Sequence, residues 1–137
     1  MDVGLAHYTA CNGLELSSED QFAIGAEVSL KIHGTFVGVV VKMAKESGVT
    51  PWSLLPKGNQ IFSRLFRGGG GTSVIKLGPK EIRVEIAGVP LFQIPYFRQA
   101  LRGIYHAGIA LFCGRVYVTE MVKKGTPSSV VLHIAWA

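Results

Sequence analysis

The sequence predicts an α+β fold in which a helical amino-terminal half packs on a small antiparallel sheet. Two patterns and the segment between them support this class. Apolar residues recur at helical spacing before residue 67, and they alternate with charged residues after residue 80. Between the two patterns lies a run of four glycines, residues 68–71. The predicted order of elements is α-α-α-β-β-α-β-β, and a length of 137 residues favours a single domain, 1–137.

The first predicted element is a long helix over residues 19–47. Residues 1–16 show little periodicity and are expected to form an irregular lead-in. The segment SSEDQ then supplies a capping serine and two acidic side chains, which favour the positive end of a helix dipole. Polar residues recur every three or four positions from Glu27 to Lys45, and the residues between them are apolar, which is typical of a helix with a wide buried face. Whether this helix is interrupted near Gly34 is left open, and Gly48 is expected to follow its last turn as the capping glycine.

Two shorter helical pieces are expected before the glycines. Thr50 and Pro51 are typical of a helix cap and first turn, and Pro56 breaks this segment. Residues 61–66 form the second piece, which is short and amphipathic.

The glycine run in RLFRGGGG does not match a phosphate-binding P-loop, which needs a preceding strand, a lysine in the run and a following helix. Here a helix precedes, a strand follows and the run has no lysine. We therefore expect residues 68–71 to be a flexible joint between the two halves. The alternative is that Arg64, Arg67 and the loop amides bind an anion.

The second half is predicted to contain four strands and one helix. Apolar and charged residues alternate in KEIRVEIAG, as in a half-buried strand, and TSVIKL pairs with it across the turn at Gly78 and Pro79. The last two strands are GRVYVTEMV and SVVLHIAWA, joined by KKGTPS. Between the two pairs, IPYFRQALRGIYHAG is a helix, with Arg98 and Arg102 expected to face outward. Its expected inward residues are Phe97, Leu101, Ile104 and Gly108.

Composition limits the classes of function. Apolar residues make up 48% of the chain and charged residues 17%, so we expect an oligomer interface or an apolar ligand cavity. The net charge is +5, but the basic residues are scattered, which argues against a nucleic-acid partner. No signal peptide is visible, and no apolar stretch approaches the roughly 20 residues of a membrane span. A cytoplasmic protein with reduced thiols is the simplest expectation.

No arrangement of residues typical of an enzyme is visible, so we expect a protein without catalytic activity, cofactor or bound metal. Cys113 has no local base and is expected to be a buried structural thiol. His7 and Cys11 lie four residues apart but supply only two ligands, too few for a metal site. His133 shares a strand face with Val131, either as a sheet-face residue or as a polar group in a cavity. Glu120 lies between apolar strand residues and needs a cationic partner, Arg102 or Arg115.

The carboxyl-terminal half resembles the end of the four-vinyl-reductase-type ligand-binding domains, which relate in fold to Bet-three-like TRAPP subunits and to haem–nitric-oxide-binding domains. The resemblance rests on Gly103 and Gly108 in a helix, the strand GRVYV, Glu120, the turn at Gly125 and the last strand HIAW. Over residues 20–137, the chain is still more similar to an uncharacterised bacterial family that is abundant in myxobacteria. This resemblance implies a homodimer with an apolar ligand cavity among its helices, and in the Bet-three-like relatives that cavity takes an acyl chain.

Two departures from these relatives bear on cofactors. Metal-binding members follow the glutamate with cysteines, whereas Glu120 is followed here by Met121 and Val122, so no zinc site carries over. Haem-binding relatives carry a Tyr-x-Ser-x-Arg motif that this chain lacks.

These arguments predict a binding or sensory module that acts as a homodimer and holds a small apolar or acyl ligand. The alternative is a protein–protein interaction scaffold without a ligand. The expected ligand-binding residues are Phe36, Val40, Phe97, Leu101, Tyr105, Cys113 and His133.

Overall fold

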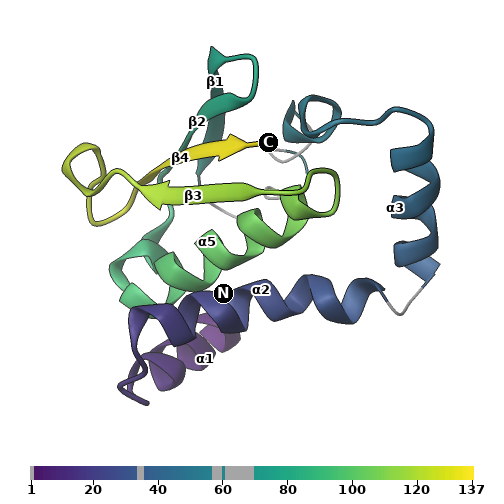
Figure 1. Cartoon of the computed structure of the whole chain (residues 1–137). Helices are drawn as coiled ribbons and strands as arrows, with labels where there is room; N and C mark the ends of the chain where they lie inside the picture. Colours follow the sequence, from purple (N-terminus) through teal and green to yellow (C-terminus); the bar gives the residue numbers. More distant parts are fainter. Residues whose placement is uncertain (1, 34–35, 57–59, 61–69) are drawn as a thin grey trace.

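A computed structural model describes residues 2–33, 36–56, 60 and 70–137 (Figure 1). It confirms the α+β class: helices come first, and a four-stranded antiparallel sheet with one helix between its strand pairs follows. The helices of the first half are α1 (Asp2–Asn12), α2 (Ser18–His33), α3 (Phe36–Glu46) and a short turn of helix at residues 51–56. The second half contains β1 (Gly71–Gly78), β2 (Glu81–Ala87), the 3-10 helix η1 (Pro90–Gln93), α5 (Pro95–Ala110), β3 (Val116–Glu120), the 3-10 helix η2 (Val122–Lys124) and β4 (Val130–Trp136).

The irregular lead-in expected over residues 1–16 is wrong, because residues 2–12 form helix α1. Tertiary packing explains the difference. The Tyr8 ring meets the Phe97 ring edge-on, with centroids 4.8 Å apart, and Cys11 also packs against the core. Within the described residues, α1 packs through a narrow side that includes Tyr8 and Cys11, so its sequence shows little apolar periodicity.

The helix expected over residues 19–47, for which the sequence leaves an interruption near Gly34 open, is two helices, α2 and α3, and residues 34–35 between them lie outside the described residues. Helix α2 begins at a Ser17 cap, whose hydroxyl accepts a hydrogen bond from the Asp20 amide at 3.1 Å. Helix α3 runs at a steep angle to α2 (Figure 1) and ends at Gly48, which has a φ of +79°.

The segment that follows α3 is described only in part. Residues 51–56 are helical after Thr50 and Pro51, as expected. The amphipathic piece at residues 61–66, the anion alternative at Arg64 and Arg67, and residues 68–69 of the glycine joint lie outside the described residues.

The other two glycines of the predicted joint are tightly placed. Gly70 has a φ of +89°, and a Cβ there would lie 2.7 Å from both the Ala87 carbonyl oxygen and Val89 Cγ2. Gly71 is the first residue of β1. Gly70 thus packs against the end of β2 and Gly71 is paired with Ala87, and the flexible joint over residues 68–71 stays a prediction.

The sheet has the strand order β1-β2-β4-β3, and every neighbouring pair is antiparallel. The predicted hairpin across Gly78 and Pro79 is confirmed. The alternation in β2 is confirmed as well, since Ile82, Val84 and Ile86 are all 0% exposed. On the same face, β4 contributes the equally buried Leu132 and Ile134.

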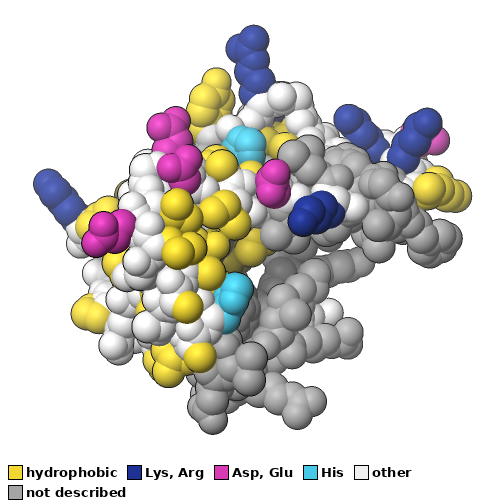
Figure 2. Space-filling model, turned by 90° about the horizontal axis from the view of Figure 1, so that it is seen from below, with side chains coloured by type: hydrophobic (Ala, Val, Ile, Leu, Met, Phe, Trp, Pro, Cys, Tyr) yellow, Lys and Arg dark blue, Asp and Glu magenta, His cyan; other side chains and the backbone are white. Residues whose placement is uncertain are grey.

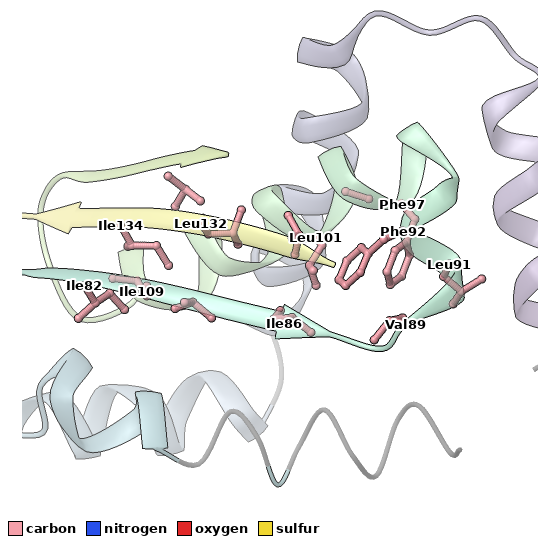
Figure 3. Packing of buried hydrophobic residues seen from close by; sticks show 14 of the residues in the cluster. Ile82, Ile86, Val89, Leu91, Phe92, Phe97, Leu101, Ile109, Leu132 and Ile134 are labelled. Atoms are coloured by element: carbon pink, nitrogen blue, oxygen red, sulfur yellow. The ribbon is translucent and has the colours of Figure 1, made fainter. Parts of the chain in front are cut away.

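Helix α5 covers this inner face of the sheet, and the core lies between them (Figure 3). Phe97 and Leu101 point into this core together with Phe92 and Leu91 from η1. The expected inward position of Ile104 is wrong, since its side chain is 43% exposed. The reason is that α5 has two buried sides, because the small residues Ala100, Gly103 and Ala107 are buried as well.

The second side of α5 packs against α2 at very short range. A Cβ added at Gly103 would meet the Phe22 carbonyl oxygen and lie 2.7 Å from the Ala26 amide nitrogen. In the opposite direction, a Cβ added at Gly25 would lie 2.7 Å from the carbonyl carbon of Ala100. The two helices therefore touch backbone to backbone, with a glycine from each side at the crossing.

Candidate functional site

The structure separates the expected ligand-binding residues instead of gathering them around one cavity. Phe97 and Leu101 are 2% and 6% exposed and belong to the filled core between α5 and the sheet. His133 lies on the opposite, outer face of the sheet, so it cannot share a cavity with them. Phe36 and Val40 belong to α3, but their side chains lie outside the described part of the chain.

Tyr105 and Cys113 remain as half-buried residues at the border of the core. Tyr105, Ile109 and Cys113 are spaced by four, so they follow one side of α5 into the turn after it. The Cys113 thiol donates a hydrogen bond to the Ile109 carbonyl oxygen at 3.1 Å. Burial raises the pKa of Cys113, while the charges of Lys45 and Lys80 act in the opposite direction. This thiol is therefore protonated at neutral pH and matches the expected structural cysteine.

Tyr105 is the polar group at this border. Burial raises the pKa of its phenol to about 12, so the hydroxyl stays protonated across the physiological range. A neutral hydroxyl at the margin of an apolar core is suited to orient one polar atom of a bound molecule.

Two tryptophans close the same end of the sheet. Trp52 donates from Nε1 to the Pro79 carbonyl oxygen at 2.8 Å, and its ring meets the Trp136 ring at 5.2 Å. Lys76 Nζ lies 4.9 Å from the centroid of the Trp52 ring. We call Trp52, Tyr105, Cys113 and Trp136 the aromatic rim. Within this set, the contact of Trp52 with Trp136 joins helix 51–56 to the end of β4, and Tyr105 and Cys113 pack against the same core.

The outer face of the sheet is polar around His133. His133 Nε2 lies 2.5 Å from Glu81 Oε1, and Arg83 Nε lies 2.8 Å from Glu85 Oε1. A depression of about 370 Å³ opens on this face, and charged and apolar side chains line it together: Arg83, Glu85, Ile86, Ala87, Lys124, Ser129, Val130 and Val131. His133 is not one of these lining residues, and its pairing with Glu81 on the outer face favours the sheet-face interpretation of His133.

Arg98 is the polar centre that the sequence did not reveal. It pairs with Glu120 at 2.6 Å between Nη1 and Oε1, and only 18% and 9% of the two side chains are exposed. The same guanidinium donates from Nε to the Phe92 carbonyl oxygen at 2.6 Å, and from Nη2 to the carbonyl oxygens of Ser129, at 3.1 Å, and Thr126. Arg98 therefore holds η1, α5 and the β3–β4 loop together.

This network corrects two expectations. Arg98 does not face outward, and the partner of Glu120 is neither Arg102 nor Arg115. Arg102 also turns back onto the protein, where Nη2 donates to the Val118 carbonyl oxygen at 3.1 Å. The long side chain of an arginine on a helix can fold back onto the protein and pair with a buried carboxylate. No local sequence pattern identifies which arginine forms that pair.

Within residues 2–33, 36–56, 60 and 70–137, no three His, Cys, Asp or Glu side chains lie together in a group that could hold a metal ion. The helices of these segments also include none with the length and apolar character needed to cross a membrane.

Comparisons with known proteins add a likeness of fold. No protein-family model matches the chain, and no curated protein does. Two solved structures resemble it at 11% identity, with a TM-score of 0.57 over 87% of the chain. In one, protein-induced porphyrin distortion modulates the redox potential of heme, and the other was used to probe the function of heme distortion in the H-NOX family.

The chain spans 65% and 61% of the length of those two proteins, so it matches less than two thirds of either. At 11% identity the likeness establishes the α+β fold alone. It agrees with the haem–nitric-oxide-binding branch of the expected superfamily at that level. Membership of the four-vinyl-reductase, TRAPP-like or myxobacterial-type families stays a prediction.

His133 and His106 are not placed to ligate a heme iron. Heme iron needs an axial ligand that faces a slot wide enough for the porphyrin. His133 pairs with Glu81 outside the sheet, and His106 meets the Phe22 ring edge-on at 5.4 Å beside the α2–α5 crossing. That crossing is closed by backbone contact, and side chains fill the core on the other side of α5. In this part of the chain, neither imidazole therefore faces a space of the required shape.

Proposed function

We propose that this chain is a non-enzymatic binding or sensory module that acts as a homodimer through its helical half and holds a small apolar or acyl ligand. The observation that carries the proposal is the apolar surface of the helices. Ile24, Val39 and Met43 on α2 and α3 are 42%, 56% and 62% exposed. Seen from below, hydrophobic side chains gather on the described part of this face, with acidic and histidine side chains beside them (Figure 2).

A second copy of the chain is the simplest cover for this surface. The opposite side of α2 is already occupied by α5 through the glycine crossing. Ile24, Val39 and Met43 stay exposed to solvent on the described part of α2 and α3. An isologous contact buries the same patch on both subunits and is the commonest way to form a dimer.

The aromatic rim supports the ligand part of the proposal. It combines flat apolar rings with one neutral hydroxyl, Tyr105, and one protonated thiol, Cys113. Ligand pockets typically combine a mostly apolar lining with a few placed polar groups. The two structures of similar fold come from work on heme redox potential and heme distortion.

A pair of substitutions tests the dimer. Val39→Asp with Met43→Asp adds charge to side chains that are exposed in the single chain, so the monomer should still fold. Sedimentation at micromolar concentration should show a dimer for the wild type and a monomer for the double variant. Val122→Asp is the matched control, because Val122 is 73% exposed on η2 in the sheet half and should leave the dimer intact. A monomeric wild type would contradict the proposal.

The scaffold without a ligand remains the second candidate, because the core between α5 and the sheet is filled by its own side chains. Native mass spectrometry of protein purified from cells separates the two. A retained small molecule that is lost in Tyr105→Phe favours the ligand module. A dimer without any retained mass, unchanged after incubation with fatty acids of several lengths, favours the scaffold.

A further inference from the structure

We propose that the depression on the outer face of the sheet binds a small organic monoanion, a short aliphatic carboxylate, through Lys124 and Arg83. Its volume of about 370 Å³ lies near the lower end of the range of about 300–1,000 Å³ that is typical of small-molecule sites. The proposal goes beyond the proposed function, which places its ligand at the aromatic rim. Tyr105 of that rim belongs to α5, and α5 covers the opposite, inner face of the sheet.

The floor of the depression is apolar. Val131 on β4 lies directly opposite Glu85 on β2, and side chains alternate along a strand, so Val131 projects from the face opposite the buried Leu132. Although it points away from α5, Val131 is only 6% exposed. The walls of the depression therefore shield it from solvent, and a short aliphatic group would meet an apolar surface there.

Lys124 supplies a cation that has no ion pair. It is the last residue of η2, it lines the depression, and it is exposed. The ion pairs among the described residues are those of Arg83 with Glu85, Arg98 with Glu120 and His133 with Glu81, so none of them involves Lys124. Its ammonium group is therefore available to an anion that enters the depression.

Arg83 supplies a second cation, and its donors are not used by the backbone. Its Nε lies 2.8 Å from Glu85 Oε1, yet this buried nitrogen has no hydrogen-bond partner in the described part of the chain. Arg98 and Arg102, in contrast, donate to backbone carbonyl oxygens that fix their guanidinium groups. A guanidinium group that keeps free donors matches the planar geometry of a carboxylate.

The charges in the depression favour a single negative charge on the ligand. Arg83 and Lys124 are cations and Glu85 is an anion, so the three side chains together carry one formal positive charge. A dianion would place its second charge near the Glu85 carboxylate, and like charges repel. A short carboxylate combines one negative charge with the aliphatic group that the Val131 floor would contact.

Butyrate is the probe that tests this site. Amide NMR shifts of the isotope-labelled chain, recorded at constant ionic strength, should change saturably with butyrate, with a dissociation constant on the order of millimolar. The largest changes should lie at Ser129 and Val131, which line the depression. Butyramide, which has a similar shape without the charge, and sulfate, which is a dianion, should each bind at least about fivefold more weakly.

Substitutions identify the cations that bind the probe. Lys124→Gln and Arg83→Gln should each raise the dissociation constant of butyrate by about fivefold or more. Lys123→Gln is the matched control, because it removes the same charge from the adjacent residue, which does not line the depression. Both lysines are exposed, so both variants should fold, and circular dichroism checks that they do. The control should change the dissociation constant by less than about twofold.

Three results would overturn the proposal: butyrate shifts that do not saturate, butyramide that binds as tightly as butyrate, or equal losses in Lys123→Gln and Lys124→Gln. Equal losses would mean diffuse attraction to a basic surface. The Tyr105→Phe variant separates this site from the aromatic rim, and it should bind butyrate as the wild type does. Shifts that centre on Tyr105 and disappear in Tyr105→Phe would contradict the site at the depression while supporting the proposed function.

Discussion

Replacing Gly103 with alanine should separate the two central helices, although alanine is the better helix former. The added methyl group would overlap the Phe22 carbonyl oxygen and lie 2.7 Å from the Ala26 nitrogen, and backbone atoms cannot rotate away as a side chain can. Overpacking of a core typically costs about 1–3 kcal/mol, and backbone overlap belongs at the upper end. Alanine regains about 1 kcal/mol of helix propensity. We therefore expect a net loss of about 2 kcal/mol or more in the free energy of unfolding.

Gly108 provides the control on the same helix. A Cβ at Gly108 would meet nothing within 4 Å, so Gly108→Ala should stabilise the protein by about 0.5–1 kcal/mol. Urea unfolding followed by circular dichroism measures both variants against the wild type, with the midpoint and slope fitted separately. If Gly103→Ala were as stable as Gly108→Ala, the backbone contact between α2 and α5 would be refuted.

Three other substitutions test separate features. Arg98→Ala leaves the Glu120 carboxylate, whose side chain is 9% exposed, without its cation, and should lower the free energy of unfolding by about 3 kcal/mol in urea melts; a loss below about 0.5 kcal/mol would mean that the pair is solvated. Tyr105 has a folded-state pKa of about 12, above the value near 10 of an unfolded chain, so its contribution is complete below pH 10 and is lost as pH rises to 12. Between pH 10 and pH 12 the wild type should lose up to roughly 2 kcal/mol of unfolding free energy that the Tyr105→Phe variant does not lose. Identical pH profiles of the two proteins would contradict the raised pKa of Tyr105. Gly70→Ala should destabilise by about 1–3 kcal/mol because of its positive φ and close contacts, whereas Gly71→Ala, with nothing within 4 Å, should be nearly neutral in the same melts.

The sheet was the most predictable part of the fold. In β2, the alternation of apolar and charged residues predicts one buried face, and Ile82, Val84 and Ile86 are all buried. The turn at Gly78 and Pro79 also carries its own local signal. Both features depend on neighbours in sequence, so sequence alone was enough.

The orientation of α5 and the helical nature of α1 were not predictable in the same way. Ala100 and Gly103 are buried because a second helix backbone approaches them, and small residues carry no apolar signal of their own. Helix α1 depends on Tyr8 meeting α5. Such contacts join residues far apart in sequence, and periodicity within one segment does not report them.

The candidate site was predicted only residue by residue. Tyr105 and Cys113 both pack at the border of the buried core. His133 was correctly placed on a strand face, but which face looks toward α5 depends on the register of the whole sheet. The pairing of Arg98 with Glu120 depends on the packing of η1 and the β3–β4 loop, for which the sequence has no local marker.

The glycine crossing of α2 and α5 also determines when the protein can fold as it is synthesised. Gly25 meets Ala100, which the ribosome adds 75 residues later. Strand β2 can pair with β4 only after β4 has been synthesised, whereas the β1–β2 hairpin can form as soon as β2 is complete. Folding dominated by such distant contacts is slow, because loop closure precedes the contacts that stabilise it. A nascent chain that ends before α5 has emerged would present the glycine side of α2 to solvent, and a chaperone or a second nascent chain would meet that surface first.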